Sequence, residues 1–182
     1  FGGPRNVADF PEQHPVSAAL LEACQEAGIP YREDLNNGNQ EGCTWFQMTA
    51  KGGKRHSAAV AYLHPAMKRA NLLVELRAMT TRILFEGKKA VGVEFRQNGE
   101  TRKVMAVREV ILAAGSVESP KLLEISGIGQ GELLAELGVP VVHESKLVGE
   151  NMQDHVMIGC QARLKEDWHS INHRATGLNL VK

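Results

Sequence analysis

The run from residue 109 to residue 120 joins an apolar stretch, small residues and a helix start, an arrangement that suits a phosphate-bearing ligand. Residues 109–115 predict a buried strand, apolar on both faces, which ends in Ala114 and Gly115 and so lets a ligand approach its backbone closely. Ser119 and Pro120 then predict a helix with Pro in its first turn and free N–H groups that point toward the ligand. By itself, a turn of small residues is more often a sign of tight helix–strand packing.

The segments around this run predict a chain of mixed helix and strand, α/β (α+β) in class. Residues 80–85, 90–96 and 102–107 favour strands and are separated by good turn sequences, which predicts an antiparallel meander ahead of the strand at 109–115. Helices are predicted at residues 17–27, 57–63, 119–125 and 131–137, and further short strands at residues 44–49, 72–76, 139–143 and 156–164.

Charge and composition exclude several classes of protein. The 182 residues hold 21 Lys and Arg against 21 Asp and Glu, and this balance argues against a nucleic-acid partner, which would need a basic excess. Hydrophobic residues make up 43%, as in ordinary globular proteins, but no apolar run approaches the roughly 20 residues that cross a bilayer. We therefore expect no nucleic acid and no integral membrane segment. Because no signal-like segment is present, a cytoplasmic location is expected over secretion.

The cysteines give no sign of a metal site or a disulfide framework. Their number is odd, and none of them has the C-x-x-C spacing of zinc sites and redox motifs. We expect reduced thiols that act as small apolar side chains at Cys24, Cys43 and Cys160.

Three motifs resemble the glucose–methanol–choline (GMC) family of flavin oxidoreductases. Residues 115–129, Gly-Ser-Val-Glu-Ser-Pro-Lys-Leu-Leu-Glu-Ile-Ser-Gly-Ile-Gly, are similar to a family signature with a small pair, Ser-Pro, an aliphatic pair and Ser-Gly-aliphatic-Gly. Residues 148–155, Val-Gly-Glu-Asn-Met-Gln-Asp-His, resemble a second motif in which Met152 replaces the usual Leu, a change that conserves volume. Residues 53–63 resemble a third stretch. The likeness covers roughly residues 14–164 and is nearest the choline- and alcohol-dehydrogenase-like branch.

This resemblance implies a fold, a cofactor and a reaction. Residues 1–155 would form part of a Rossmann-like FAD-binding domain with an inserted β-meander, and residues 156–182 would begin a substrate-binding domain. The implied cofactor is FAD, and the implied reaction oxidises a CH–OH group of a primary alcohol or choline-like substrate by hydride transfer to the flavin. The expected partner is thus a small alcohol. The implied FAD-binding residues are Thr80, through its main chain at the adenine, Ala114 and Gly115 near the ribose and pyrophosphate, and Asn151, Gln153, Asp154 and His155 along the junction between the flavin and the substrate domain.

Two parts that the family needs for catalysis are missing from these residues. The sequence has no G-x-G-x-x-G phosphate loop, since the glycines at 127, 129 and 131 follow a helix and not a strand. The family's base is a His near the C-terminus, and no residue here corresponds to it, so no catalytic residue is assigned. We expect an internal fragment that is inactive alone. The alternatives are a non-catalytic module that retains the scaffold for nucleotide or partner binding, and another two-dinucleotide flavoprotein.

Three histidines could suggest other chemistry. Asp154 precedes His155, but neighbours on an extended segment point in opposite directions, which favours a structural histidine over a catalytic base. His169 and His173 are four residues apart and could pair as metal ligands on a helix face. Because no third ligand lies near them in the sequence, solvated surface residues are expected.

Overall fold

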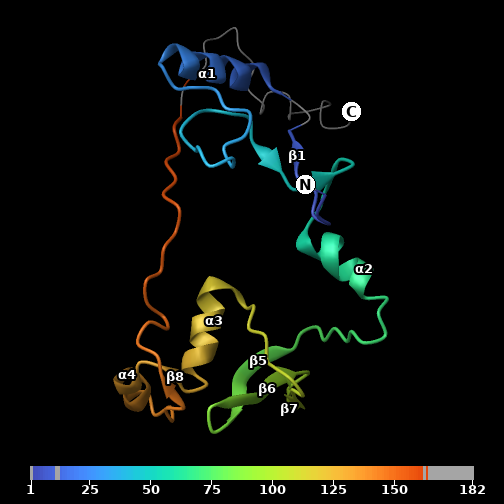
Figure 1. Ribbon diagram of the computed structural model, residues 1–182, viewed down its shortest axis with the longest axis vertical. Coiled ribbons are helices and arrows are strands. Elements are labelled where there is room, and N and C mark those ends of the chain that lie inside the picture. Colours follow the sequence, from blue (N-terminus) through green and yellow to red (C-terminus); the bar gives the residue numbers. More distant parts are fainter. Residues whose placement is uncertain (1, 11–12, 162, 164–182) are drawn as a thin grey trace. The chain divides into compact units, whose positions relative to one another are not determined.

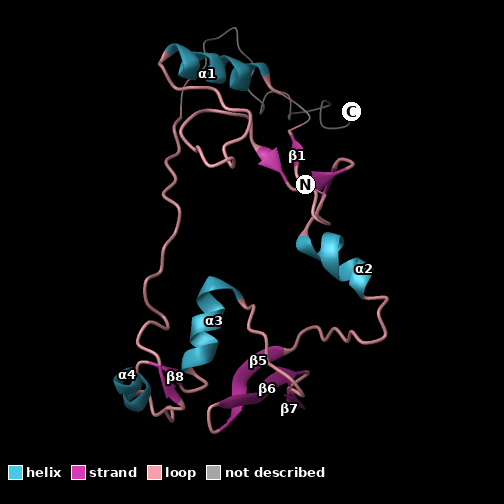
Figure 2. Ribbon diagram, viewed as in Figure 1, coloured by secondary structure: helices cyan, strands magenta, loops and turns pink. Residues whose placement is uncertain are grey.

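The computed structural model describes residues 2–10, 13–161 and 163, and their helices and strands confirm the mixed class (Figures 1 and 2). The chain divides into two compact units. The first unit contains the described residues up to 73 together with those from 159 onward, and the second contains residues 74–158.

The first unit begins its regular structure with helix α1 (Pro15–Glu26). The imidazole Nδ1 of His14 accepts a hydrogen bond from the Val16 N–H at 3.3 Å and so caps the first turn. Pro15 is well placed here because the first helical residue needs no backbone N–H. The helix therefore begins two residues before the predicted start. It ends at Glu26, and Gly28, the predicted stop signal, follows the cap residue Ala27 with a φ of +86°, which suits a residue without a side chain.

Short strands and one helical segment complete the first unit. Strand β1 (Ala8–Asp9) pairs with β2 (Gln47–Met48), and β3 (Ala50–Lys51) pairs with β4 (Lys54–Arg55), each pair antiparallel. The predicted turn at residues 52–53 connects β3 to β4. A π-helical turn (Ala59–Leu63) leads into α2 (His64–Ala66), close to the predicted helix. The predicted strand at 44–49 shrinks to β2, and the strand predicted at 72–76 is absent from this described segment.

The second unit is built on the predicted meander. Strands β5 (Met79–Glu86), β6 (Lys89–Gln97) and β7 (Glu100–Met105) pair in that order, all antiparallel. The turn between β6 and β7 has two residues with positive φ, Asn98 at +53° and Gly99 at +84°, which is the backbone that a tight hairpin requires. The Asn-Gly signal in the sequence was therefore correct.

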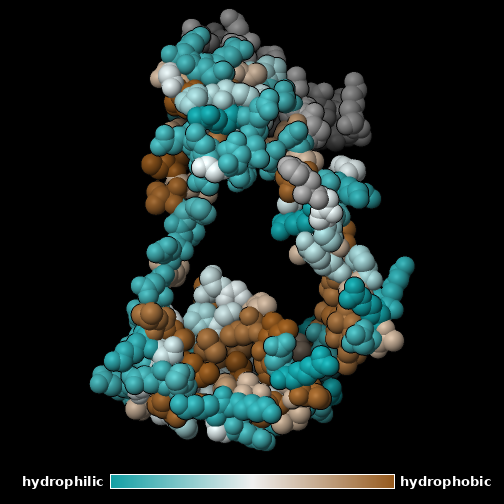
Figure 3. All heavy atoms as spheres, in the orientation of Figure 1, coloured by the Kyte–Doolittle hydropathy of each residue, from teal (hydrophilic) through white to brown (hydrophobic). Residues whose placement is uncertain are grey.

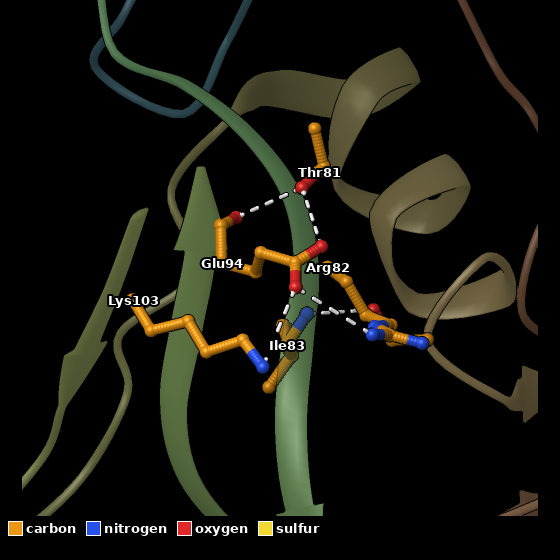
Figure 4. Close-up of polar contacts among 6 residues, drawn as sticks. Thr81, Arg82, Ile83, Glu94 and Lys103 are labelled. Atoms are coloured by element: carbon orange, nitrogen blue, oxygen red, sulfur yellow. Dashed lines mark hydrogen bonds and ion pairs between the residues drawn. The ribbon is translucent and has the colours of Figure 1, made fainter. Parts of the chain in front are cut away.

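A polar cluster on one face of the meander surrounds Glu94 of β6 (Figure 4). Its carboxylate accepts a hydrogen bond from the Thr81 hydroxyl at 3.2 Å and lies 3.6 Å from the guanidinium of Arg82 and 3.8 Å from the ammonium of Lys103. Both cationic side chains are more than half exposed. Each exposed pair is therefore worth about 0–1 kcal/mol, and the cluster mainly fixes the register of the three strands.

Helix α3 (Gly115–Glu124) packs on β5 of the meander, and the short elements that follow it pack on α3 and on one another. These elements are β8 (Ile128–Gly129), α4 (Gly131–Glu136) and β9 (His143–Glu144). Strands β8 and β9 are parallel, and α4 connects them. The buried core side chains come from the sheet and from both helices: Ile83, Phe95, Leu122 and Leu134.

Two predictions near α3 are wrong. Residues 109–115 form no strand, and Ile111 is 80% exposed, because no described strand runs beside this segment to pair with its backbone. Hydrophobic surface is correspondingly visible on the second unit (Figure 3). Helix α3 begins at Gly115 and not at Ser119, so Pro120 lies inside the helix instead of in its first turn. The predicted strand at 156–164 is also absent from residues 156–161 and 163, and the rest of it lies outside the described residues.

Candidate functional site

The start of α3 holds two of the predicted site residues. Ala114 precedes the helix and Gly115 is its first residue, with a φ of +94°. The hydroxyl oxygen of Ser119, one turn later, accepts a hydrogen bond from the Ala114 N–H at 3.1 Å. Ser119 thus stabilises the turn that leads into the helix, in place of its predicted role as the first helical residue. The geometry leaves the N–H groups of the first helical turn for another acceptor.

The surface in front of this helix start is open. Residues 113–118 are exposed, and a Cβ built on Gly115 would meet no atom within 4 Å. Small residues, free N–H groups and the positive end of a helix are what a phosphate or another anionic group requires. These residues therefore have the chemistry to hold an anionic group such as a phosphate of FAD. The sequence contains no G-x-G-x-x-G loop that would hold the pyrophosphate.

The second group of predicted residues follows an anchored turn. A Cβ on Gly149 (φ +82°) would lie 2.7 Å from a carboxylate oxygen of Glu124, so the backbone at 149 packs directly on the last residue of α3. The Gln130 side-chain amide donates a hydrogen bond to the Glu150 carboxylate at 2.6 Å. Together these contacts fix the chain up to residue 150.

Beyond residue 150 the chain is extended and exposed. Asn151 has a φ of +57°, and this left-handed residue marks the change of direction. The carboxylate of Asp154 accepts a hydrogen bond from the backbone N–H of His155 at 2.8 Å. Asp154 therefore engages the main chain of His155, which agrees with the expectation that it does not orient the imidazole. Gln153 lies in the same exposed stretch.

Thr80 occupies the first half of β5, opposite Phe95 of β6. It is exposed, and the ladder is irregular immediately after it, between Thr80 and Arg82. A disturbed ladder at this point is compatible with a main-chain contact to a ligand, because an irregular ladder leaves backbone groups without a strand partner.

The structure does not bring these three groups together. Ala114 and Gly115 lie at the N-terminal end of α3, whereas the turn at Gly149 contacts its C-terminal end. A helix of 10 residues separates the two ends by about 15 Å. Within the described part of the chain, no hydrogen bond or ion pair joins Thr80 to either end. Separations of this order suit an elongated ligand better than a compact one.

Sequence reasoning missed the residue that holds this arrangement in place. Ser126 is buried, its hydroxyl donates to the Leu122 carbonyl at 2.5 Å, and its oxygen accepts from the Ile83 N–H at 2.9 Å. It thereby joins the C-terminal end of α3 to the middle of β5. The sequence does contain a signal for this role. Ser126 is a polar residue between the apolar Ile125 and the glycine turn at 127, and a hydroxyl that is buried there needs hydrogen-bond partners.

The first unit contains a cavity of about 520 Å³ beside the hairpin of β3 and β4. The side-chain amide of Asn6 donates to the Ala50 carbonyl at 2.6 Å, and the Asn6 N–H donates to Nδ1 of His56 at 3.0 Å. These two bonds fix one wall of the cavity. The residues that line it are Asn6, Ala8, Asp9 and residues 48–55, the last of which begin the third motif.

The described part of the chain brings no three His, Cys, Asp or Glu side chains together in a way that could hold a metal ion. His169 and His173 lie outside it. No helix among residues 2–10, 13–161 and 163 is long and apolar enough to cross a membrane.

Comparisons with known proteins agree with the motifs. Residues 3–157 match the family described as GMC oxidoreductase. The chain is 49% identical over 159 residues to the mitochondrial choline dehydrogenase of Homo sapiens, and this match covers 87% of the chain and 27% of the relative. It is 45% identical over 154 residues to the oxygen-dependent choline dehydrogenase of Chromohalobacter salexigens, covering 84% of the chain and 28% of the relative.

A solved structure gives the same result for the fold. An FAD-dependent oxidoreductase from Chaetomium thermophilum superposes with a TM-score of 0.74 at 32% identity, covering 79% of this chain and 25% of that one. The chain therefore spans about a quarter of the length of the relatives that it matches. The matches support the α/β FAD-binding fold and FAD as the cofactor, as the sequence predicted.

Proposed function

Because the chain belongs to the GMC oxidoreductase family, we propose that it contributes part of the FAD-binding domain of an enzyme that oxidises a CH–OH group. The proposed substrate is a primary alcohol or a choline-like alcohol. The observation that supports this class is the 49% identity to a choline dehydrogenase over 159 residues. Since the chain spans 27% of that relative, we propose the activity for the enzyme to which this chain would contribute and not for these residues alone.

The proposed role of this chain is to hold and orient the cofactor. Bound FAD would accept the hydride that leaves the substrate carbon. Ala114 and Gly115 would offer the open start of α3 to the ribose and pyrophosphate side. Thr80 would contact the adenine through its main chain. Asn151, Gln153, Asp154 and His155 would line the junction with the substrate domain, on the stretch that the turn at residues 149–150 positions.

The proposed division of the chain follows from these roles. Residues 1–155 would belong to the FAD-binding domain and residues 156–182 would begin the substrate-binding domain. No residue of this chain is assigned the proton transfer from the substrate hydroxyl. The 182 residues alone would therefore be inactive.

A segment exchange tests the function directly. The corresponding segment of the Chromohalobacter salexigens enzyme would be replaced by residues of this chain, and the unmodified enzyme would serve as the control. We expect the chimaera to retain bound flavin and to be reduced by choline under anaerobic conditions. A folded chimaera without flavin would contradict the FAD-binding role. A folded, flavin-containing chimaera that neither choline nor a primary alcohol reduces would contradict the substrate class.

The isolated chain provides the complementary test. The 182 residues would be mixed anaerobically with FAD and choline, and flavin absorbance would be followed over time. We expect no reduction above that of free FAD, since neither a phosphate loop nor a base is assigned here. Measurable reduction would show that the chain is catalytic by itself and would contradict this part of the proposal.

A further inference from the structure

Two of the three cysteines, 19 positions apart in the sequence, meet in the first unit. Cys24 lies in the last turns of α1, and Cys43 forms an isolated bridge with Tyr31. The Sγ of Cys43 is 4.0 Å from the carbonyl oxygen of Leu21 and 3.9 Å from that of Ile29. Leu21 lies one turn before Cys24, and Ile29 donates its N–H to the Cys24 carbonyl at 2.9 Å. The thiol of Cys43 thus lies between the backbone groups that flank Cys24.

The backbone holds Cys43 in this position. Its N–H donates to the Pro30 carbonyl at 2.9 Å, and its carbonyl accepts from the Arg32 N–H at 3.0 Å. The preceding residue, Gly42, allows this approach, because a Cβ there would lie 2.6 Å from the Pro30 oxygen. Ordinary side chains at position 42 would push the strand-like segment away from α1. The position of Cys43 beside the last turns of α1 is therefore built into the loop.

The surroundings of Cys43 raise the pKa of its thiol, and Cys24 is one of the causes. Partial burial raises the pKa of the Cys43 thiol above its ordinary value of 9.0, and the neighbouring Cys24 raises the pKa further, both as a charge and as a hydrogen-bond partner. A hydrogen bond that raises the pKa is one in which the Cys43 thiol donates to the Cys24 sulfur. Both side chains are half-buried, whereas Cys160 is exposed. A small oxidant can therefore reach the pair.

We propose that Cys24 and Cys43 are a dithiol pair that a low-molecular-weight disulfide, such as oxidised glutathione, converts reversibly into an intramolecular disulfide. One cysteine thiolate attacks a sulfur of the small disulfide, which forms a mixed disulfide and releases one small thiol. The second cysteine then attacks the protein sulfur of the mixed disulfide and releases the second small thiol. The two cysteines lose two electrons and two protons, and the two small thiols receive them.

The new bond would fasten the end of α1 to the loop that runs from Pro30 to Cys43. In the unfolded chain it would close a loop of about 20 residues, which restricts the unfolded state more than the folded one. Oxidation should therefore raise the thermal unfolding temperature of the protein. Because the attacking species is the thiolate, the rate of oxidation should rise about tenfold per pH unit below the thiol pKa.

Peptide mapping of the full-length protein tests the pair. The reduced protein would be incubated with oxidised glutathione, alkylated and digested with trypsin, which cuts after Arg32 and so separates the two cysteines. We expect the peptide of Cys24 to be joined to the peptide of Cys43, with a mass lower by two hydrogen atoms than the sum of the two. Dithiothreitol should release both peptides. Finding the two cysteines only as separate glutathione adducts, or joined to other cysteines, would overturn the proposal.

Single substitutions provide the matched control. Cys24→Ser and Cys43→Ser should each abolish the joined peptide and leave the remaining cysteine of the pair as a glutathione adduct. Cys160→Ser should leave the joined peptide at the wild-type level. If a variant fails to fold, the mapping of the wild-type protein still decides the question. An equal loss in the Cys160→Ser protein would also overturn the proposal.

Discussion

The backbone N–H of Ile83 donates a hydrogen bond to the hydroxyl of Ser126 at 2.9 Å, 43 residues further along the chain. Ile83 lies in the middle of β5, whose outer edge has no strand partner in the three-stranded meander. Ser126 follows the last turn of α3 and is 6% exposed. Together with the packing of α3 on β5, this bond attaches the helix that begins at Gly115 to the sheet that contains Thr80, two of the proposed cofactor contacts.

Replacing Ser126 by Ala should destabilise the protein. The variant leaves the buried N–H of Ile83 without an acceptor, and an unsatisfied buried donor costs about 1–3 kcal/mol. Ser116→Ala is the matched control, since Ser116 is an exposed serine of α3 and its replacement should change the free energy of unfolding by no more than about 0.5 kcal/mol. Urea unfolding of the full-length variants would measure both effects. Equal losses in the two variants would show that the Ser126–Ile83 bond is not the cause.

Replacing Gly127 by Ala should disrupt the junction between β8 and the chain that leads to β9. Gly127 has a φ of +92°, and a Cβ there would collide with the Pro140 carbonyl oxygen and approach Cγ2 of Val142 to 2.9 Å. Gly138→Ala separates backbone strain from the collision of the new Cβ. Gly138 also has a positive φ, +70°, but no atom lies within 4 Å of a Cβ built there. We expect Gly138→Ala to lower the free energy of unfolding by about 1 kcal/mol, from backbone strain alone. Gly127→Ala should lower the free energy of unfolding at least twice as much, as measured by urea unfolding. Similar losses in the two variants would show that the collision with Pro140 does not contribute.

Much of this fold could be predicted from the sequence. The elements that were predicted correctly are those specified by residues within the element or its turn. The meander was predicted because Asn98-Gly99 specifies a tight hairpin whatever surrounds it. Helix α1 was predicted because apolar periodicity and Gly28 define its body and its end. In contrast, residues 109–115 were predicted as a strand on apolarity alone, and a strand also needs a neighbour to pair with. The start of α3 was misplaced because Pro120 resembles a first-turn proline.

The candidate site depended on a different kind of information. The motifs identified Ala114, Gly115 and the stretch from Asn151 by resemblance, which gives residues but not their separation. The distance between these groups follows from tertiary contacts, namely Ser126 with Ile83 and Gly149 with Glu124. The Cys24–Cys43 pair was missed for the same reason, since 18 residues separate the two cysteines in the sequence and only the folded loop brings them close.

The raised pKa of Cys43 predicts a pH-dependent contribution to stability in reducing conditions. The folded state holds the thiol proton more tightly than the unfolded state does, so this contribution is complete below the ordinary pKa of 9.0 and is lost as the pH rises through the folded pKa. The stability difference between wild type and Cys43→Ser should therefore shrink above pH 9. The difference between wild type and Cys160→Ser serves as the control and should show no such trend. Urea unfolding between pH 7 and pH 10 would measure both; a difference that grows with pH would contradict the direction of the shift.

Replacing Gly115 by Val should weaken FAD binding in the full-length protein. The side chain would fill the open space before the first turn of α3, where the nucleotide side of the cofactor is proposed to lie. Gly138→Val controls for strain, because both glycines have positive φ and neither has an atom within 4 Å of a built Cβ. Both variants should lose similar stability, about 1–2 kcal/mol. Only Gly115→Val should raise the Kd for FAD, by at least tenfold in a titration of the apoprotein followed by flavin fluorescence. Equal Kd values for the two variants would place the cofactor away from this helix start.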